Sequence, residues 1–238
     1  MCGRFTARFT SEDLVAAYGV DPLTVGAPRY NVCPTQQILA VRQDQSGHRT
    51  ASPLRWGVVP HWAKDLSIGA KMTNARSETV AEKPAFRSAI KARRCIIPGS
   101  GWYEWAAVAG KKVPHYFTRR DGAPCNFAGI WESWTAPERE IIETCSILTT
   151  DANELMRSVH DRMPVILAPG DFALWLDAEV HDPAKLQHLY LPFASDQLQE
   201  WEVAPLVNST RNNSEECVKP LIAQGPLLGA RIFGKEFR

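Results

Sequence analysis

The sequence feature that most constrains the fold is a series of short strand-like runs with a turn about every ten residues. Turn signals separate these runs, for example Asp121-Gly122 and the polar stretch at residues 44–47. The runs themselves occupy residues 37–42, 95–97, 102–105, 115–118, 127–134, 144–149 and 165–167. With a few helices around them, they predict an α+β fold built on a mostly antiparallel sheet or an irregular barrel.

Helix signals are fewer. Thr10 is followed three residues later by Asp13, which is the pattern of a capped helix start, and Gly19 provides its end. Further helices are predicted at residues 84–94, 153–157 and 171–176, and from residue 182 onward. Because no repeat, low-complexity tract or linker composition divides the chain, residues 1–238 are predicted to form a single domain.

Composition limits the possible functions. The chain is 45% hydrophobic and 22% charged with a net charge of +1, so any nucleic-acid binding must come from a local patch. The six cysteines form no C-x-x-C pair and no zinc spacing with histidine, so we expect no metal and no cofactor. No signal peptide and no membrane-length apolar run are recognised. We therefore expect free thiols, a cytoplasmic location and a monomer with no membrane association.

The N-terminus has unusual chemistry if Met1 is removed, as is usual before a small second residue. Cys2 would then carry an α-amine and a thiol two carbons apart, with pKa values near ~8 and ~8.5. An aldehyde can condense with this amine to give an imine, and the thiol can then close a thiazolidine ring. A small residue after Met1 is common, however, so Cys2 taken alone is equally consistent with an ordinary N-terminal residue.

Two further polar residues are candidates for catalysis. Glu104 lies among aromatic residues in the run Trp-Tyr-Glu-Trp, where lost hydration would raise its pKa as a general acid or base requires. Strand alternation would instead turn it toward solvent. His160 precedes Asp161 and is either a structural or a catalytic histidine. Together with Cys2 and the amide of Asn74, these residues would suit covalent catalysis if they meet in space.

Two segments are candidates for nucleic-acid contact. Residues 54–62 hold Trp56 and Trp62, either as core side chains or as a platform on which bases stack. Residues 73–78 are polar and are predicted to be a loop or a helix start. If residues 84–94 are helical, one face carries four cations, either solvated or contacting phosphates: Lys83, Arg87, Lys91 and Arg94.

Eight motifs occur in order along the first 167 residues: MCGRF at 1–5, RYNVCPTQ at 29–36, RWGVVPHWAKD at 55–65, TNARSETVAEKPAFR at 73–87, RRCIIPGSGWYEW at 93–105, FAGIWESW at 127–134, ILTTDAN at 147–153 and VHDRMPVIL at 159–167. In these motifs the chain resembles the SRAP family, the SOS-response-associated-peptidase proteins that sense abasic sites in single-stranded DNA. Residues 168–238 match only loosely.

The resemblance implies a role for each matching residue. Cys2 matches the family's nucleophile, which forms a thiazolidine with the ring-opened aldehyde of an abasic deoxyribose. Asn74 matches the asparagine that holds the sugar or the Cys2 backbone. Glu104 matches the carboxylate that shuttles protons, and His160 matches the histidine that helps to open the sugar or to stabilise or reverse the adduct. The implied DNA contacts are Arg4, Trp62, Arg76 and Arg162.

The resemblance thus implies a covalent DNA–protein crosslink that shields the lesion from strand cleavage, with abasic single-stranded DNA as partner and no cofactor. The sequence departs from the family at two places. Cys33 stands where alanine is usual, and Gly99-Ser100 stands where Ala-Asp is common. Neither change removes a predicted catalytic residue.

Two other functions remain open from the sequence. The first is a cysteine peptidase or N-terminal-nucleophile hydrolase, with Cys2 as nucleophile and Glu104 or His160 as base, which removes its own Met1 or cleaves other peptides. The second is a non-catalytic module that binds single strands.

Overall fold

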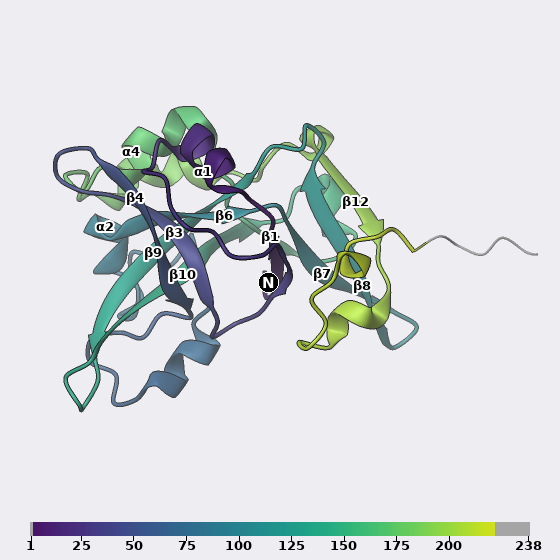
Figure 1. The fold of residues 1–238 in the computed structure, drawn as a ribbon, viewed down its shortest axis with the longest axis horizontal. Helices are drawn as coiled ribbons and strands as arrows, with labels where there is room; N and C mark the ends of the chain where they lie inside the picture. Colours follow the sequence, from purple (N-terminus) through teal and green to yellow (C-terminus); the bar gives the residue numbers. More distant parts are fainter. Residues whose placement is uncertain (1, 222–238) are drawn as a thin grey trace, which may run out of the picture.

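The computed structural model describes residues 2–221, which form two β-sheets with short helices packed around the larger one (Figure 1). The α-helices are α1 (Ser11–Tyr18), α2 (Ala89–Ala92), α3 (Glu154–Arg157) and α4 (Phe172–Leu176). The strands are β1 (Phe5–Ala7), β2 (Arg29–Val32), β3 (Gln37–Gln43), β4 (Arg49–Trp56), β5 (Asn74–Arg76), β6 (Arg94–Gly99), β7 (Gly101–Val108), β8 (Lys111–Arg119), β9 (Cys125–Thr135), β10 (Ile141–Asp151), β11 (Arg162–Pro164) and β12 (Leu198–Glu202).

Five strands of the larger sheet close into a ring. β3 pairs antiparallel with β4 and β6, β6 pairs with β9, and β9 pairs with β10. β10 then returns to β4 in parallel, while β5 and β11 add to β10 outside the ring. The result is an irregular, mostly antiparallel barrel with peripheral helices, which confirms the predicted fold class.

The smaller sheet has the strand order β12-β8-β7-β1-β2 and lies beside the barrel (Figure 1). The chain passes from one sheet to the other at Ser100, because Gly99 ends β6 in the barrel and Gly101 begins β7 opposite Thr6. Glycine is required at position 101, since a Cβ there would collide with the Tyr116 hydroxyl. The short segment around Ser100 is therefore a crossover between the two sheets.

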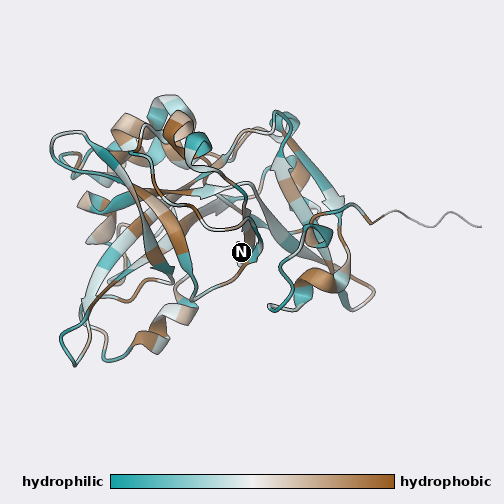
Figure 2. Cartoon of the chain, viewed as in Figure 1, coloured by the Kyte–Doolittle hydropathy of each residue, from teal (hydrophilic) through white to brown (hydrophobic). Residues whose placement is uncertain are grey.

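The main hydrophobic core lies between the two sheets and includes the N-terminal segment. Its buried side chains come from both sheets, among them Cys2, Phe5, Trp56, Trp102, Phe117, Phe127, Ile147 and Leu198. A second cluster fills the space between the barrel and the helices, with members such as Leu14, Ile96, Leu148 and Trp175. Figure 2 shows this distribution, with apolar residues on the barrel strands and polar residues on the hairpin loops at its edge. Side chains from both sheets therefore pack around β1.

The predicted helix-capping residues are confirmed, because their side chains form hydrogen bonds with backbone groups at the helix ends. The Thr10 hydroxyl accepts from the Asp13 N–H, the Asp13 carboxylate accepts from the Thr10 N–H, and Gly19 ends α1 with φ 67°. The Asn153 side chain likewise accepts from the Met156 N–H at the start of α3. These caps depend on neighbouring residues only, which is why the sequence reveals them.

Several elements differ from the prediction. The helix predicted over residues 84–94 shrinks to α2, because Arg94 already belongs to β6 and pairs with Ile130. Residues 73–78 hold strand β5 rather than a loop or helix start. The strand predicted at 165–167 makes only an isolated bridge through Ile166, directly after β11. Strands β1, β2 and β12 were not predicted. All of these depend on pairing with distant strands, which local patterns do not carry.

Candidate active site

The N-terminal segment runs along β7 and brings Cys2 to Glu104. The Tyr103 N–H donates to the Arg4 carbonyl at 2.9 Å, and Phe5 lies opposite Trp102 in the antiparallel register. Continued toward the N-terminus, this register places residues 2 and 3 beside Glu104. Cys2 is fully buried there, in the core between the sheets.

Asn74 reaches Cys2 from the other sheet. Its Nδ2 donates to the Cys2 carbonyl at 2.9 Å. β5 directs this side chain because alternate residues face opposite sides, and the neighbouring Ala75 is buried in the cluster beneath the helices. The Asn74 Oδ1 is buried without a hydrogen-bond partner within residues 2–221, so an acceptor remains beside the Cys2 backbone.

Glu104 has the environment of a proton-transfer group. Its side chain is 4% exposed, and this burial raises the pKa of the carboxyl, while the nearby charge of His160 lowers it in part. Burial also raises the pKa of the Cys2 thiol, and the negative charge of Glu104 raises it further. The thiol is therefore protonated at neutral pH, and the Glu104 carboxyl is close enough to act on its titration.

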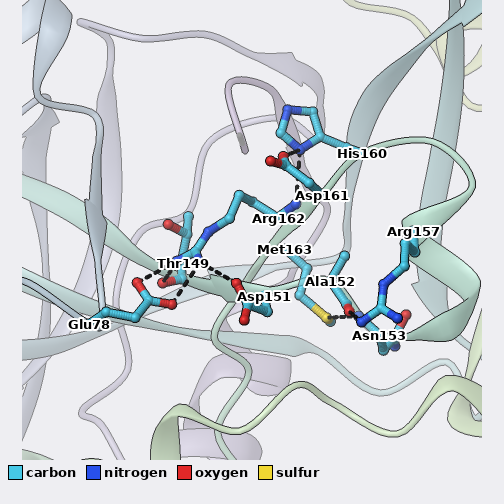
Figure 3. Close-up of polar contacts among 10 residues, drawn as sticks. All are labelled: Glu78, Thr149, Asp151, Ala152, Asn153, Arg157, His160, Asp161, Arg162 and Met163. Atoms are coloured by element: carbon cyan, nitrogen blue, oxygen red, sulfur yellow. Dashed lines mark hydrogen bonds and ion pairs between the residues drawn. The ribbon is translucent and has the colours of Figure 1, made fainter.

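His160 follows α3 and is fixed by its backbone and by Nδ1. Its N–H donates to the Met156 carbonyl at 2.9 Å. Nδ1 lies 3.0 Å from the Arg162 N–H and 2.8 Å from an Asp161 carboxylate oxygen (Figure 3). The backbone contact requires a lone pair on Nδ1, whereas the carboxylate contact requires a proton there. The charge of His160 is one of those that lower the pKa of the Glu104 carboxyl, which links the ring to the site.

The structure thus brings together all four residues predicted to be catalytic, from the N-terminus, β5, β7 and the segment between α3 and β11. No pair among Cys2, Asn74, Glu104 and His160 is close in sequence. Their meeting depends on both sheets and on β1 between them. A nucleophile, an amide, a buried carboxyl and an imidazole around one point can capture an electrophile and move protons during that capture.

Arg162 has a different environment from the one predicted. Its guanidinium donates to both carboxylate oxygens of Glu78, at 2.6 and 2.9 Å, and to Asp151 at 2.7 Å. It also donates to the Thr149 carbonyl at 2.7 Å (Figure 3). Burial opposes the charge of Arg162, but the hydrogen bonds to Glu78 outweigh burial and raise the pKa. Because both terminal nitrogens are engaged inside the protein, we revise the predicted DNA contact at Arg162 to a structural clamp for β10 and β11.

The three other predicted DNA contacts lie in distinct settings. Trp62 is 51% exposed in the loop after β4, as a stacking residue requires. Arg76 is exposed at the end of β5, on the same side of the strand as Asn74. Arg4 is half-buried, donates to Asn31 and to the Val207 carbonyl, and lies over the Trp105 ring at 5.7 Å.

The remaining sequence candidates fall outside the site. Trp56 is fully buried and is a core residue. The basic stripe is not formed, because Arg94 is buried and donates to the carbonyls of Ile90 and Trp175. Cys33 is also buried, and its thiol donates to the Asn31 carbonyl at 3.2 Å. All six cysteines are free thiols.

Two residues near the site were missed by the sequence analysis. Trp102 and Thr149 each bury a side-chain polar atom that has no hydrogen-bond partner within residues 2–221. Trp102 packs in the cluster that contains Cys2, and Thr149 shares a face of β10 with Ile147 of that cluster. Their strand context gave no sign of unsatisfied polar atoms, because burial of individual atoms is a tertiary property.

A cavity of about 700 Å³ lies on the other face of the smaller sheet and is separate from the Cys2 site. Tyr116 and Thr118 line it, whereas Phe117 between them packs against the core that contains Cys2. Within residues 2–221, no three His, Cys, Asp or Glu side chains gather as metal ligands do. The same part of the chain has no helix long and apolar enough to cross a membrane.

Known proteins are similar to this chain in sequence and in fold. A family model described as SOS response associated peptidase (SRAP) matches residues 1–210. The abasic site processing protein YoaM of Bacillus subtilis (strain 168) is 44% identical over 220 residues, which cover 91% of this chain and 96% of that protein. The abasic site processing protein HMCES of Mus musculus is 31% identical, over 81% of this chain and 65% of that protein.

Solved structures agree with these matches. A crystal structure of a protein from Bacteroides thetaiotaomicron aligns with a TM-score of 0.83 at 26% identity, over 93% of this chain and 100% of that one. A second, from Bordetella bronchiseptica, aligns with a TM-score of 0.76 at 30% identity, over 85% of this chain and 100% of that one. The matched region contains every residue of the candidate active site.

Proposed function

The chain belongs to the SRAP family, and on this basis we propose that it captures abasic sites in single-stranded DNA as a thiazolidine crosslink through Cys2. Capture follows removal of Met1, which frees the α-amine. We also propose that residues 1–238 act as one monomeric domain that associates with DNA in the cytoplasm. The observation that carries the proposal is the meeting of Cys2, Asn74 and Glu104, with His160 beside them.

The chemistry balances without a cofactor. The Cys2 amine adds to the C1′ aldehyde of the ring-opened sugar, and the carbinolamine loses water to give an imine. The thiol then adds across the C=N bond, so that a C–S bond forms and the thiol proton moves to nitrogen. The net change is loss of one water. Because the imine is consumed, the β-elimination that would cleave the strand is suppressed.

Glu104 is the group suited to move these protons. As a carboxylate it accepts a proton from the ammonium form of Cys2, and as an acid it protonates the departing hydroxyl of the carbinolamine. Burial raises the pKa of this carboxyl, which makes its protonated form easier to reach than that of an exposed glutamate. A protonated thiol is compatible with this order of events, because the amine reacts first.

Asn74 and His160 position the reacting groups. Asn74 already holds the Cys2 carbonyl, and its unpartnered Oδ1 can accept from the freed amine or from a sugar hydroxyl. The Nε2 of His160 can take the proton of the C1′ hydroxyl and return it to the ring oxygen, which opens the sugar to the aldehyde. Trp62, Arg76 and Arg4 are the proposed contacts to the bases and phosphates of the strand.

A denaturing-gel and intact-mass experiment tests the proposal. The protein is mixed with a single-stranded oligonucleotide that carries one abasic site, beside Cys2→Ala and a variant with an uncleavable extension before Cys2. We expect a denaturation-resistant species with the summed mass of protein and strand less one water, absent in both variants. A parent protein that lacks Met1 and yields no such species would contradict covalent capture.

A further inference from the structure

A second histidine lies beside Glu104 in the smaller sheet. In the antiparallel pairing of β7 with β8, Glu104 is directly opposite His115. Residues opposite each other in antiparallel strands share a face, with Cβ atoms about 4.5–5.5 Å apart. His115 is in turn opposite Glu202 on β12. The carboxyl assigned to proton transfer therefore has an imidazole as its lateral neighbour.

This face of the sheet is the one that covers Cys2. Trp102 and Phe117 stack with ring centroids 5.3 Å apart, and both pack in the cluster that contains Cys2. Glu104 and His115 are each two residues from this pair along their strands, so they lie on the same face. Glu200 is opposite Phe117 on β12 and shares that face as well.

Glu200 holds the ring of His115. The His115 Nδ1 and a Glu200 carboxylate oxygen form an ion pair, with the two side chains 18% and 23% exposed. The carboxylate on Nδ1 fixes the orientation of the ring.

We propose that His115, held by Glu200, is a positioning residue that keeps Glu104 ionised as the base for crosslink formation. The inference rests on the proposed function and deepens it. A cation beside a desolvated carboxyl offsets part of the cost of its charge. It complements His160, whose charge acts on Glu104 from the segment between α3 and β11. The charged groups around Glu104 and His115 are Cys2, Asp161 and His160 on one side, and Glu200 and Glu202 on the other.

The test is the pH profile of single-turnover crosslinking. In His115→Gln the lost cation should move the acidic limb of the profile upward by about 0.5–2 pH units, the effect of one charge at roughly 6–8 Å in a partly hydrated site. Glu200→Gln should move it in the same direction, and His115→Lys should restore the parent profile. His48→Gln is the matched control, since His48 pairs with Asp21 at 3.0 Å on an exposed surface. That variant should leave the profile unchanged.

A second measurement needs no DNA. The titration of the Glu104 carboxyl, followed by carbon NMR in the free protein, should shift upward in His115→Gln by the same amount as the kinetic limb. Unshifted profiles and titrations in His115→Gln and Glu200→Gln would overturn the inference while leaving Cys2-dependent capture intact. If the parent forms no crosslink at all, the proposed function fails, and the NMR titration still decides whether His115 acts on Glu104.

Discussion

Arg162 gives the sharpest test of how this structure assigns roles to its arginines. The change Arg162→Met keeps most of the side-chain volume but removes the guanidinium that links Glu78, Asp151 and the Thr149 carbonyl. Arg76→Met is the matched control, because Arg76 is exposed at the end of the neighbouring strand β5. If Arg162 is a clamp and Arg76 a phosphate contact, the two variants should lose different properties.

The expected loss of stability follows from the exposure of each partner. The buried Thr149 carbonyl also accepts from the Ser77 N–H at 2.9 Å, so losing the Arg162 donor removes one of its two hydrogen bonds, at a cost of about 0.5–1.5 kcal/mol. The side chains of Glu78 and Asp151 are 46% and 76% exposed, so each ion pair should add no more than about 1 kcal/mol. The total is about 0.5–3.5 kcal/mol, which lowers the melting temperature by roughly 1–14 °C in a chain of this size.

Urea unfolding and salt-dependent DNA binding measure the two properties separately. Arg162→Met should lower the urea midpoint with an unchanged slope m and keep the salt dependence of binding to single strands. Arg76→Met should leave the midpoint unchanged but flatten the plot of log affinity against log salt by about 0.7. A stable Arg162→Met protein with a flattened salt plot would refute the clamp and restore the predicted DNA contact.

The clamp also has a pH signature. The hydrogen bonds from Arg162 outweigh the burial that would raise the pKa of Glu78, so this pKa is lowered in the folded protein. The associated stability is therefore present above the unfolded pKa of 4.5 and is lost as pH falls through the folded value. Arg162→Met should remove this component, so its stability should depend less on pH below about 4.5 than that of the parent. An identical pH dependence in both proteins would contradict the pairing.

Three further changes test other parts of the structure. Trp62→Ala should remove one stacked base and so weaken binding to undamaged single strands about 5- to 150-fold, while stability in urea stays unchanged. Equal affinities of the variant and the parent in a fluorescence titration would remove Trp62 from the interface. Glu104→Gln should slow crosslinking in a quenched-flow gel assay and leave the affinity for undamaged strands near that of the parent, so equal rates would exclude its proton-transfer role. Gly101→Ala should destabilise the protein by about 1–3 kcal/mol, because the added Cβ would collide with Tyr116. An unchanged urea midpoint would show that the crossover between the sheets tolerates a side chain at this position.

The fold class could be predicted because its signals are local. Strand-length apolar runs with turns between them gave β3, β6, β8, β9 and β10, and capping residues gave α1 and α3. The basic stripe failed for a physical reason. Helical spacing would place Arg94 beside Lys91, but Arg94 begins a strand that pairs with β9, and the pairing overrides helix propensity. Short partner strands such as β5 and β1 become ordered only through neighbours that are distant in sequence.

The sequence suggested which residues could form the candidate site, but their arrangement appears only in the structure. Glu104 shows why the sequence did not determine the geometry. The alternation of side chains along β7 was consistent with Glu104 either in solvent or in the core. The structure decides for the core, because the same face carries Trp102, which packs under the N-terminal segment. Arg162 shows the reverse case. Its sequence position suggested a DNA contact, while the buried carbonyl and two carboxylates that engage it appear only in three dimensions.

The environment of Cys2 also bears on the choice between crosslinking and peptidase chemistry. A cysteine peptidase attacks with a thiolate, and such sites lower the thiol pKa with a cation or a helix N-terminus. Here burial and the charge of Glu104 both raise it, so the thiolate is disfavoured. Attack by the amine on an aldehyde has no such requirement, because the thiol enters only after the imine exists and can deliver its proton to nitrogen as the ring closes. The same carboxyl that suppresses thiolate chemistry is placed to accept a proton from the amine. This environment supports the proposed capture of an aldehyde, in which the C–N bond forms before the C–S bond, over thiolate attack on a peptide.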